Sequence, residues 1–300
     1  MKKVVILRSK IFEMKKILSI VIACVVIAGL SSCNKKDETT NETINGFEIQ
    51  WNSDFNIKAD RDVVRDAISD LVYVEGGTFM MGDTLDDAFE NEGPVHNVTA
   101  SSFYIGKTEV TQALWYAVMG TCGGDDSYQE WESAYGLGDE YPAYRISYSD
   151  AVNFINKMYN ITGLSFALPT EAQWEYAARG GKSTTYNKYA GSNDYRNVAV
   201  TNESYSKCSV VASKSANELG LYDMSGNVWE MCRDWYEDYV ETPDSTSVQD
   251  PEGINYGSGH KVFRGGSWNN PSRYARVTTR YKQGVHYQDK QTGFRLVIKR

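Results

Sequence analysis

Thiol and imidazole side chains, the common transition-metal ligands and nucleophiles of proteins, are sparse in this sequence. Its 300 residues include five cysteines and three histidines, and no two of them have the spacing Cys-x-x-Cys or His-x-x-x-His. Zinc sites use such spacings, so we predict no zinc site and assign no catalytic residue. Cys122, Cys208 and Cys232 lie in the part that we expect to fold. Their odd number allows one disulfide with a spare thiol, or no disulfide.

Arginine and tryptophan side chains gather toward the C-terminus. Five arginines can line a groove for an anionic ligand, but arginine also pairs with buried carboxylates, and we expect such pairs for several of them: Arg264, Arg273, Arg276, Arg280 and Arg295. Three tryptophans can form a platform for a sugar or peptide, and we expect core packing for at least two of them: Trp229, Trp235 and Trp268.

The charge balance excludes one class of partner. The chain carries a net charge of −8, of which residues 1–33 contribute +5, so the remainder carries −13. An acidic body repels phosphate backbones. We therefore expect no nucleic-acid partner.

The N-terminus has the features of an export signal. Two lysines precede an uncharged apolar run over residues 17–30, which is short for a membrane span. Leu30-Ser31-Ser32-Cys33 resembles the bacterial lipobox, whose cysteine is lipidated. We predict a signal peptide over residues 1–33, with Met14 as an alternative start, and an exported lipoprotein of the cell envelope, on the outer membrane or cell surface. The alternative is an uncleaved membrane anchor.

Downstream of Cys33, we expect residues 34–70 to form a polar tether, with a short amphipathic helix from Asp60 to Leu71 leading into the body, and residues 71–300 to form one domain. Capping signals predict helices after Thr111, Ser147 and Thr170, all in the first half of that domain. The second half has turns, short strands and aromatics, and the whole chain holds 25 glycines and 21 tyrosines. This pattern favours an α+β domain with many loops over a helical bundle.

Five phrases follow one another in a characteristic order. They are Phe103–Thr111 (FYIGKTEVT), Leu168–Gly181 (LPTEAQWEYAARGG), Gly220–Glu230 (GLYDMSGNVWE), Arg264–Trp268 (RGGSW) and Gly293–Leu296 (GFRL). Together they resemble the formylglycine-generating enzyme, or sulfatase-modifying factor, family over about residues 72–300. The resemblance implies an irregular α+β fold related to C-type lectins, with short antiparallel strands and two or three helices.

Active members of that family oxidise a substrate cysteine with copper(I) held by two thiolates, three and eight residues beyond the serine of the RGGS phrase. Counting from Ser267, these positions hold Asn270 and Ala275, and no cysteine follows Cys232. Soft Cu(I) favours thiolate ligands. We therefore do not expect copper, and the formylglycine-generating oxidase activity becomes the alternative to a non-catalytic role.

The resemblance also implies structural calcium. Relatives hold one ion at positions that correspond to the Asp223 and Glu230 carboxylates and the Gly226 and Val228 carbonyls. Calcium takes six to eight oxygen ligands, and this segment can supply several of them. A plain turn with solvated carboxylates is the alternative. A second ion would use Asn197 and Val198.

We therefore expect a lipid-anchored binding or scaffold module that is joined to the membrane only through its anchor. Its ligand would be a peptide, a protein or a glycan in a groove bounded by Trp229, Ser267, Trp268, Asn270 and Arg276. A calcium-dependent glycan binder is the second alternative.

Overall fold

The structure is a computed structural model that describes residues 41–83, 89–123, 130–184, 186–241, 243, 246–253 and 256–299. All of them belong to one compact unit, residues 39–300. The predicted signal peptide and Cys33 lie outside the described residues. Within the described ranges, no helix has both the length and the apolar character needed to cross a membrane.

Five helices occur among the described residues, and local sequence explains where the longer ones begin and end. They are α2 (Lys58–Ser69), α3 (Gln112–Met119), α4 (Tyr148–Thr162), α5 (Glu171–Ala178) and the short α6 (Tyr195–Val198). Thr111 accepts the backbone N–H of Leu114 at the start of α3, and Ser147 and Thr170 form complete capping boxes before α4 and α5. The three helices predicted from capping are confirmed.

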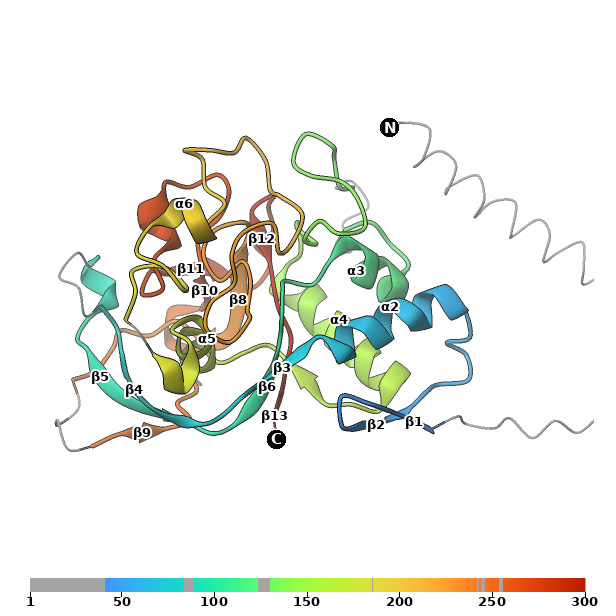
Figure 1. Ribbon diagram of the computed structural model, residues 1–300, viewed down its shortest axis with the longest axis horizontal. Coiled ribbons are helices and arrows are strands. Elements are labelled where there is room, and N and C mark those ends of the chain that lie inside the picture. The colour runs from blue at the N-terminus through green and yellow to red at the C-terminus, as the bar shows by residue number, and fades with distance from the viewer. Residues whose placement is uncertain are drawn as a thin grey trace, which may run out of the picture. The chain divides into compact units, whose positions relative to one another are not determined.

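Short strands form four small sheets (Figure 1). The sheet that carries the site has the order β11-β10-β8-β12, where β8 is Trp229–Trp235, β10 is His260–Arg264, β11 is Arg280–Gly284 and β12 is Thr292–Gly293. The second has the order β3-β6-β13-β7, which are Leu71–Val74, Phe103–Gly106, Val297–Lys299 and Phe166–Ala167. The third has the order β4-β5-β9, which are Gly77–Met81, His96–Ala100 and Val248–Gln249. Helix α5 contacts strands of the first and third sheets, and mixed α+β is the observed class.

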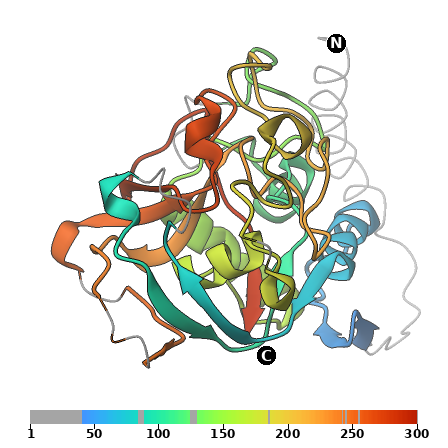
Figure 2. The same ribbon diagram turned by 60° about the vertical axis from the view of Figure 1, so that its left-hand side comes forward.

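Residues 41–70 correct the predicted tether. They form the hairpin of β1 (Asn41–Ile44) and β2 (Phe47–Gln50) and then α2, side by side at the end of the domain opposite β9 (Figure 2). Ile44, Ile49 and Trp51 are buried in the main core. The segment is polar on average, but most of its apolar residues face inward, with Ile57 exposed, so it is part of the fold.

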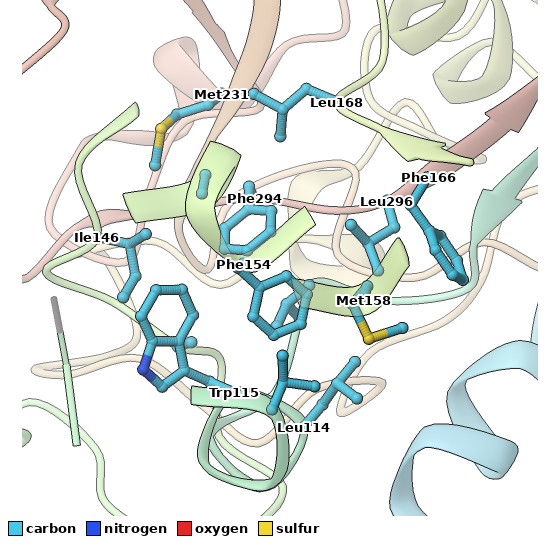
Figure 3. Packing of buried hydrophobic residues seen from close by; sticks show 14 of the residues in the cluster. Leu114, Trp115, Ile146, Phe154, Met158, Phe166, Leu168, Met231, Phe294 and Leu296 are labelled. Carbon is cyan, nitrogen blue, oxygen red and sulfur yellow. The ribbon is translucent and has the colours of Figure 1, made fainter. Parts of the chain in front are cut away.

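The main core is built from aromatic rings on helices and on the C-terminal segment (Figure 3). Phe294 lies against Trp115 of α3 and Phe154 of α4, with ring centroids 6.2 Å and 5.5 Å away. Trp115 and Phe154 stack on each other at 5.4 Å. The GFRL phrase thus anchors the end of the chain between two helices.

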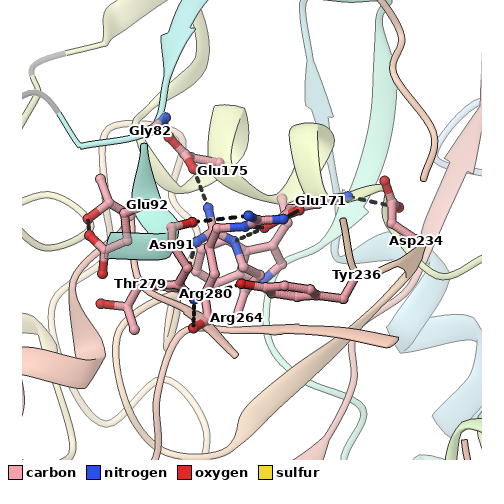
Figure 4. A network of polar contacts seen from close by, with 12 residues as sticks. Gly82, Asn91, Glu92, Glu171, Glu175, Asp234, Tyr236, Arg264, Thr279 and Arg280 are labelled. Atoms are coloured by element: carbon pink, nitrogen blue, oxygen red, sulfur yellow. Dashed lines mark hydrogen bonds and ion pairs between the residues drawn. The ribbon is translucent and has the colours of Figure 1, made fainter. Parts of the chain in front are cut away.

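A network of buried ion pairs joins α5 to the site-bearing sheet (Figure 4). Arg264 on β10 pairs with Glu175, and Arg280 on β11 pairs with Glu171 at 2.6 Å. Glu175 also accepts Arg179. All five side chains are buried. The prediction of structural arginine pairs is confirmed for Arg264 and Arg280, and charge therefore fixes α5 against the sheet.

Candidate functional site

A cavity of about 150 Å³ opens beside the first residues of β8, β11 and β12. Its lining is rich in tyrosine and in polar side chains: Trp229, Asn270, Tyr274, Tyr281, Tyr287, Asp289, Gln291 and Thr292. Sheet pairing brings these residues together, because Thr292 on β12 pairs with Trp229 on β8 while β10 connects β8 to β11.

Hydrogen bonds fix the polar floor of this cavity. Trp229 Nε1 donates to Asn270 Oδ1 at 2.9 Å. Ser267 Oγ lies 2.6 Å from the same oxygen and 2.9 Å from Gln291 Oε1. Ser267 is fully buried, so it forms a layer beneath the lining. Asn270 is therefore held in a single orientation by its neighbours.

Asp289 is the one acidic residue of the lining. Its carboxylate accepts the Gln291 backbone N–H at 2.6 Å, the Tyr287 hydroxyl at 2.8 Å and Gln291 Nε2 at 3.0 Å. Burial and Asp289 raise the pKa of Tyr287, so that hydroxyl stays protonated and donates. Three neutral donors thus fix the position of the Asp289 carboxylate.

The predicted groove is only partly brought together. Trp229 and Asn270 line the cavity and Ser267 lies beneath it. Trp268 is a correction, because it is buried in the main core with Nε1 donating to the Lys290 carbonyl. Arg276 is also a correction, because it is buried and bonds Glu92 Oε1 at 2.7 Å. Both side chains are turned away from the cavity by tertiary partners.

The three cysteines in the described residues are free thiols, with Cys208 and Cys232 buried and Cys122 exposed. None of them lines the cavity. Asn270 and Ala275, to which the resemblance assigns the positions of the copper thiolates, offer an amide and a methyl group. Because Cu(I) requires soft sulfur ligands, the residues at this site do not fit copper.

A buried charge cluster contains both carboxylates that the resemblance assigns to calcium. Arg295 donates to both oxygens of Glu230, at 2.5 Å and 2.6 Å, and Trp174 Nε1 donates to Glu230 at 2.7 Å. Asp223 accepts the Ala212 N–H at 2.7 Å, but its other oxygen has no hydrogen-bond partner. Both oxygens of Glu109 also lack one. Glu230, expected as a ligand, is thus engaged by Arg295.

This cluster carries more negative than positive charge. Glu109, Asp223 and Glu230 are all buried around the single guanidinium of Arg295. Burial raises the pKa of Glu109, as do the carboxylates of Asp223 and Glu230, and burial raises the pKa of Asp223 to about 6. Buried carboxylates without partners must take up either protons or a cation. The unpartnered oxygens of Asp223 and Glu109 are hard ligands and fit calcium.

The turn that positions Asp223 depends on Gly226. This glycine has φ +82°, and a Cβ there would lie 2.3 Å from the Val200 carbonyl oxygen. Asn227 N–H donates to that same carbonyl at 3.0 Å. The close approach of the two backbone segments explains why a glycine stands at position 226 of the GLYDMSGNVWE phrase.

The second predicted calcium pair lies elsewhere. Asn197 donates to Ser192 Oγ, and its carbonyl accepts the Ser215 N–H. Val198 is buried beside Ala275 and Tyr189. Among the residues that the structure describes, no group of three histidine, cysteine, aspartate or glutamate side chains converges as metal ligands. Both calcium sites therefore stay predictions.

Comparisons with known proteins define the class. Residues 59–300 match the sulfatase-modifying factor enzyme 1-like domain, and the chain belongs to this FGE-sulfatase family. It is 29% identical over 293 residues to the chaperone protein LppX of Paenibacillus barcinonensis, covering 81% of this chain and 84% of the relative. It is 27% identical over 257 residues to the formylglycine-generating enzyme of Streptomyces coelicolor, covering 66% of this chain and 78% of the enzyme.

Among solved structures, Treponema denticola variable protein 1 matches with a TM-score of 0.64 and 25% identity, over 87% of this chain and 99% of that one. The family and the mixed α+β fold with many short strands are confirmed, although the described residues form five helices and not the expected two or three. The names of these relatives describe different functions, a chaperone and an enzyme among them. Membership of the family therefore does not by itself assign a reaction to this chain.

Proposed function

We propose that this domain is a non-catalytic recognition module that binds a ligand in the cavity beside Trp229 and Asn270. The observation that carries the proposal is the Asn270 side chain. It occupies the position of a copper thiolate in the active family, and Trp229 and Ser267 hold it by hydrogen bonds. The cavity keeps an ordered lining of aromatic and polar groups, which suits binding. The ligand class is a peptide, a protein or a glycan.

The test is an oxidation assay with a matched gain-of-site variant. The purified chain, supplied with Cu(I), O₂ and a cysteine peptide of the sulfatase type, is expected to leave the thiol unconverted. The double variant Asn270→Cys with Ala275→Cys restores two sulfur ligands and is expected to bind Cu(I) in competition with a chelator. The single variant Asn270→Cys is the control. Aldehyde formation by the parent chain would establish the alternative, a cysteine oxidase.

We also propose a structural calcium ion held by Asp223 and Glu109, with backbone carbonyls of the turn at Gly226 and Val228. The excess of buried carboxylates and their unpartnered oxygens support it. Bound calcium would supply positive charge to this cluster. The chain's own residues orient the ligands, since the Ala212 N–H fixes Asp223 and Arg295 neutralises Glu230.

Calcium is expected to raise the melting temperature of the parent chain relative to EGTA. At a hundredfold excess over Kd the ion stabilises by about 2.7 kcal/mol, or roughly 5–10 °C for a domain of this size. Glu109→Gln should abolish this difference without lowering the melting temperature in EGTA, because the amide removes a buried charge. Glu241→Gln, at an exposed position, is the control. Equal melting of the parent with calcium and with EGTA would exclude the ion.

For location, we propose a lipoprotein attached to the cell envelope through Cys33. The argument is the lipobox-like segment Leu30–Cys33, which follows an apolar run. The folded unit begins at about residue 39, so only a few residues would separate the anchor from the domain.

A further inference from the structure

We propose that the cavity beside Trp229 binds an organic cation, an ammonium or guanidinium group, between its aromatic wall and the carboxylate of Asp289. This inference rests on the proposed recognition function and names the chemistry of its ligand. Neither a thiol substrate nor an anion is what the lining favours.

The first argument is charge. Asp289 is half-buried in the lining, and only neutral groups donate to it: the Tyr287 hydroxyl, the Gln291 amide and the Gln291 backbone N–H. In the described part of the chain, no lysine or arginine forms an ion pair with Asp289. The lining itself includes no basic residue. A ligand with positive charge would therefore complete the site, and the acidic body attracts cations over distance.

The second argument is the aromatic wall. Trp229 and Tyr281 stack at 5.2 Å with an interplanar angle of 25°, and Tyr274 and Tyr287 add two further rings. The Arg273 guanidinium lies over the Tyr274 ring, 5.1 Å from its centroid, whereas among the described residues no lysine or arginine lies over the ring of Trp229, Tyr281 or Tyr287. The electron-rich faces of tryptophan and tyrosine attract cations, most strongly where water is excluded.

The protein already uses the same set of side chains to hold one of its own cations. Lys261 Nζ lies 3.7 Å from the ring centroid of Trp235 and 4.4 Å from that of Tyr148. Burial lowers the pKa of Lys261 to about 8, and the carboxylate of Asp234 opposes that shift. Tryptophan, tyrosine and aspartate thus enclose an ammonium group there. The cavity beside Trp229 repeats this set without an internal lysine.

The size of the cavity limits what can enter. About 150 Å³ is well below the roughly 300–1,000 Å³ of pockets for drug-sized ligands. It can take the head group of a small amine or the end of a lysine or arginine side chain. A free amine and a lysine or arginine side chain both carry a cationic head group. The experiment below distinguishes these two kinds of ligand.

The test uses the full folded chain and isothermal titration with matched probes. Choline and the uncharged analogue 3,3-dimethylbutan-1-ol have nearly the same shape, and we expect choline to bind at least tenfold more tightly. The peptides acetyl-Gly-Lys-Gly-amide and acetyl-Gly-norleucine-Gly-amide form the second pair, with the same expected order. Tighter binding of the lysine peptide than of choline would identify a peptide side chain as the source, and the reverse would identify a free amine.

Two variants locate the site. Asp289→Asn removes the charge and is expected to weaken choline binding at least tenfold. Tyr281→Ala removes an exposed ring of the wall, which the fold can lose, and is expected to weaken it several-fold. Asp54→Asn and Tyr116→Ala change exposed side chains outside the lining and should have no effect.

Equal binding of charged and neutral probes, or unchanged binding in both Asp289→Asn and Tyr281→Ala, would overturn the cation proposal. If neutral sugars or uncharged peptides bind, and Tyr281→Ala weakens their binding, then recognition at this cavity stands while the cation proposal fails. If the parent chain oxidises a cysteine peptide, the recognition function itself fails.

Discussion

Replacing Arg264 with methionine is expected to lower the free energy of unfolding by about 3–5 kcal/mol, because the buried carboxylates of Glu175 and Glu171 each lose one of their two arginine partners. Arg264 is fully buried, pairs with Glu175 and donates to the Thr279 carbonyl at 2.6 Å. Its loss removes charge that also offsets Glu171. Chemical denaturation with a fixed m-value measures the change.

Two control variants distinguish the loss of a buried, well-oriented arginine from the loss of a positive charge at any position. Arg264→Lys should also destabilise, because an ammonium group cannot reproduce the planar fork that reaches both Glu175 and Thr279. Lys58→Met breaks the pair of Lys58 with Asp62, whose side chains are 89% and 40% exposed, and should leave stability unchanged. If Arg264→Met unfolds at the same denaturant concentration as the parent chain, the network does not hold α5 to the sheet.

Phe294→Ala is expected to cost about 3–5 kcal/mol, the range measured for removal of a large buried ring. Phe294 has no exposed surface and fills the space between Trp115 and Phe154. The free energy of unfolding of native proteins is only about 5–15 kcal/mol, so this change removes a large fraction of the stability. Thermal and denaturant unfolding report the loss.

Phe294→Leu provides the graded comparison, because it keeps an apolar side chain and leaves a smaller cavity, and it should destabilise less than alanine. Tyr159→Ala removes an aromatic ring that is 54% exposed and should be tolerated. Equal losses for the leucine and alanine variants would show that aromatic contacts, and not filled volume, stabilise this region.

Local signals in the sequence predicted the helices well. Thr111, Ser147 and Thr170 act on backbone groups within three residues, so their capping role can be read without knowing the fold. The tether prediction missed the hairpin of β1 and β2, because a polar composition hides its few buried residues, Ile49 among them. The short helix expected from Asp60 to Leu71 is present as α2, which packs into the core through Val64 and Ile68.

The cavity could be predicted only in part. Trp229 and Asn270 belong to, or closely follow, the recognisable phrases, and the sequence pointed to both. Tyr281, Tyr287 and Asp289 lie in a segment with no motif, and only the pairing of β11 with β10 and of β12 with β8 brings them to the same place. The cluster of tyrosines near the C-terminus was the one available signal.

The sequence by itself determined the family, the starts of α3, α4 and α5, and the absence of sulfur at positions 270 and 275, because each of these is set by residue identity or by neighbours within one turn. Only the tertiary structure decided the direction of the long polar side chains. Arg276 and Trp268 are buried, and Glu109 lies near Asp223 although more than a hundred residues of chain separate them. The reason is physical: burial requires a partner for each charge or polar atom, and that partner is chosen by the fold.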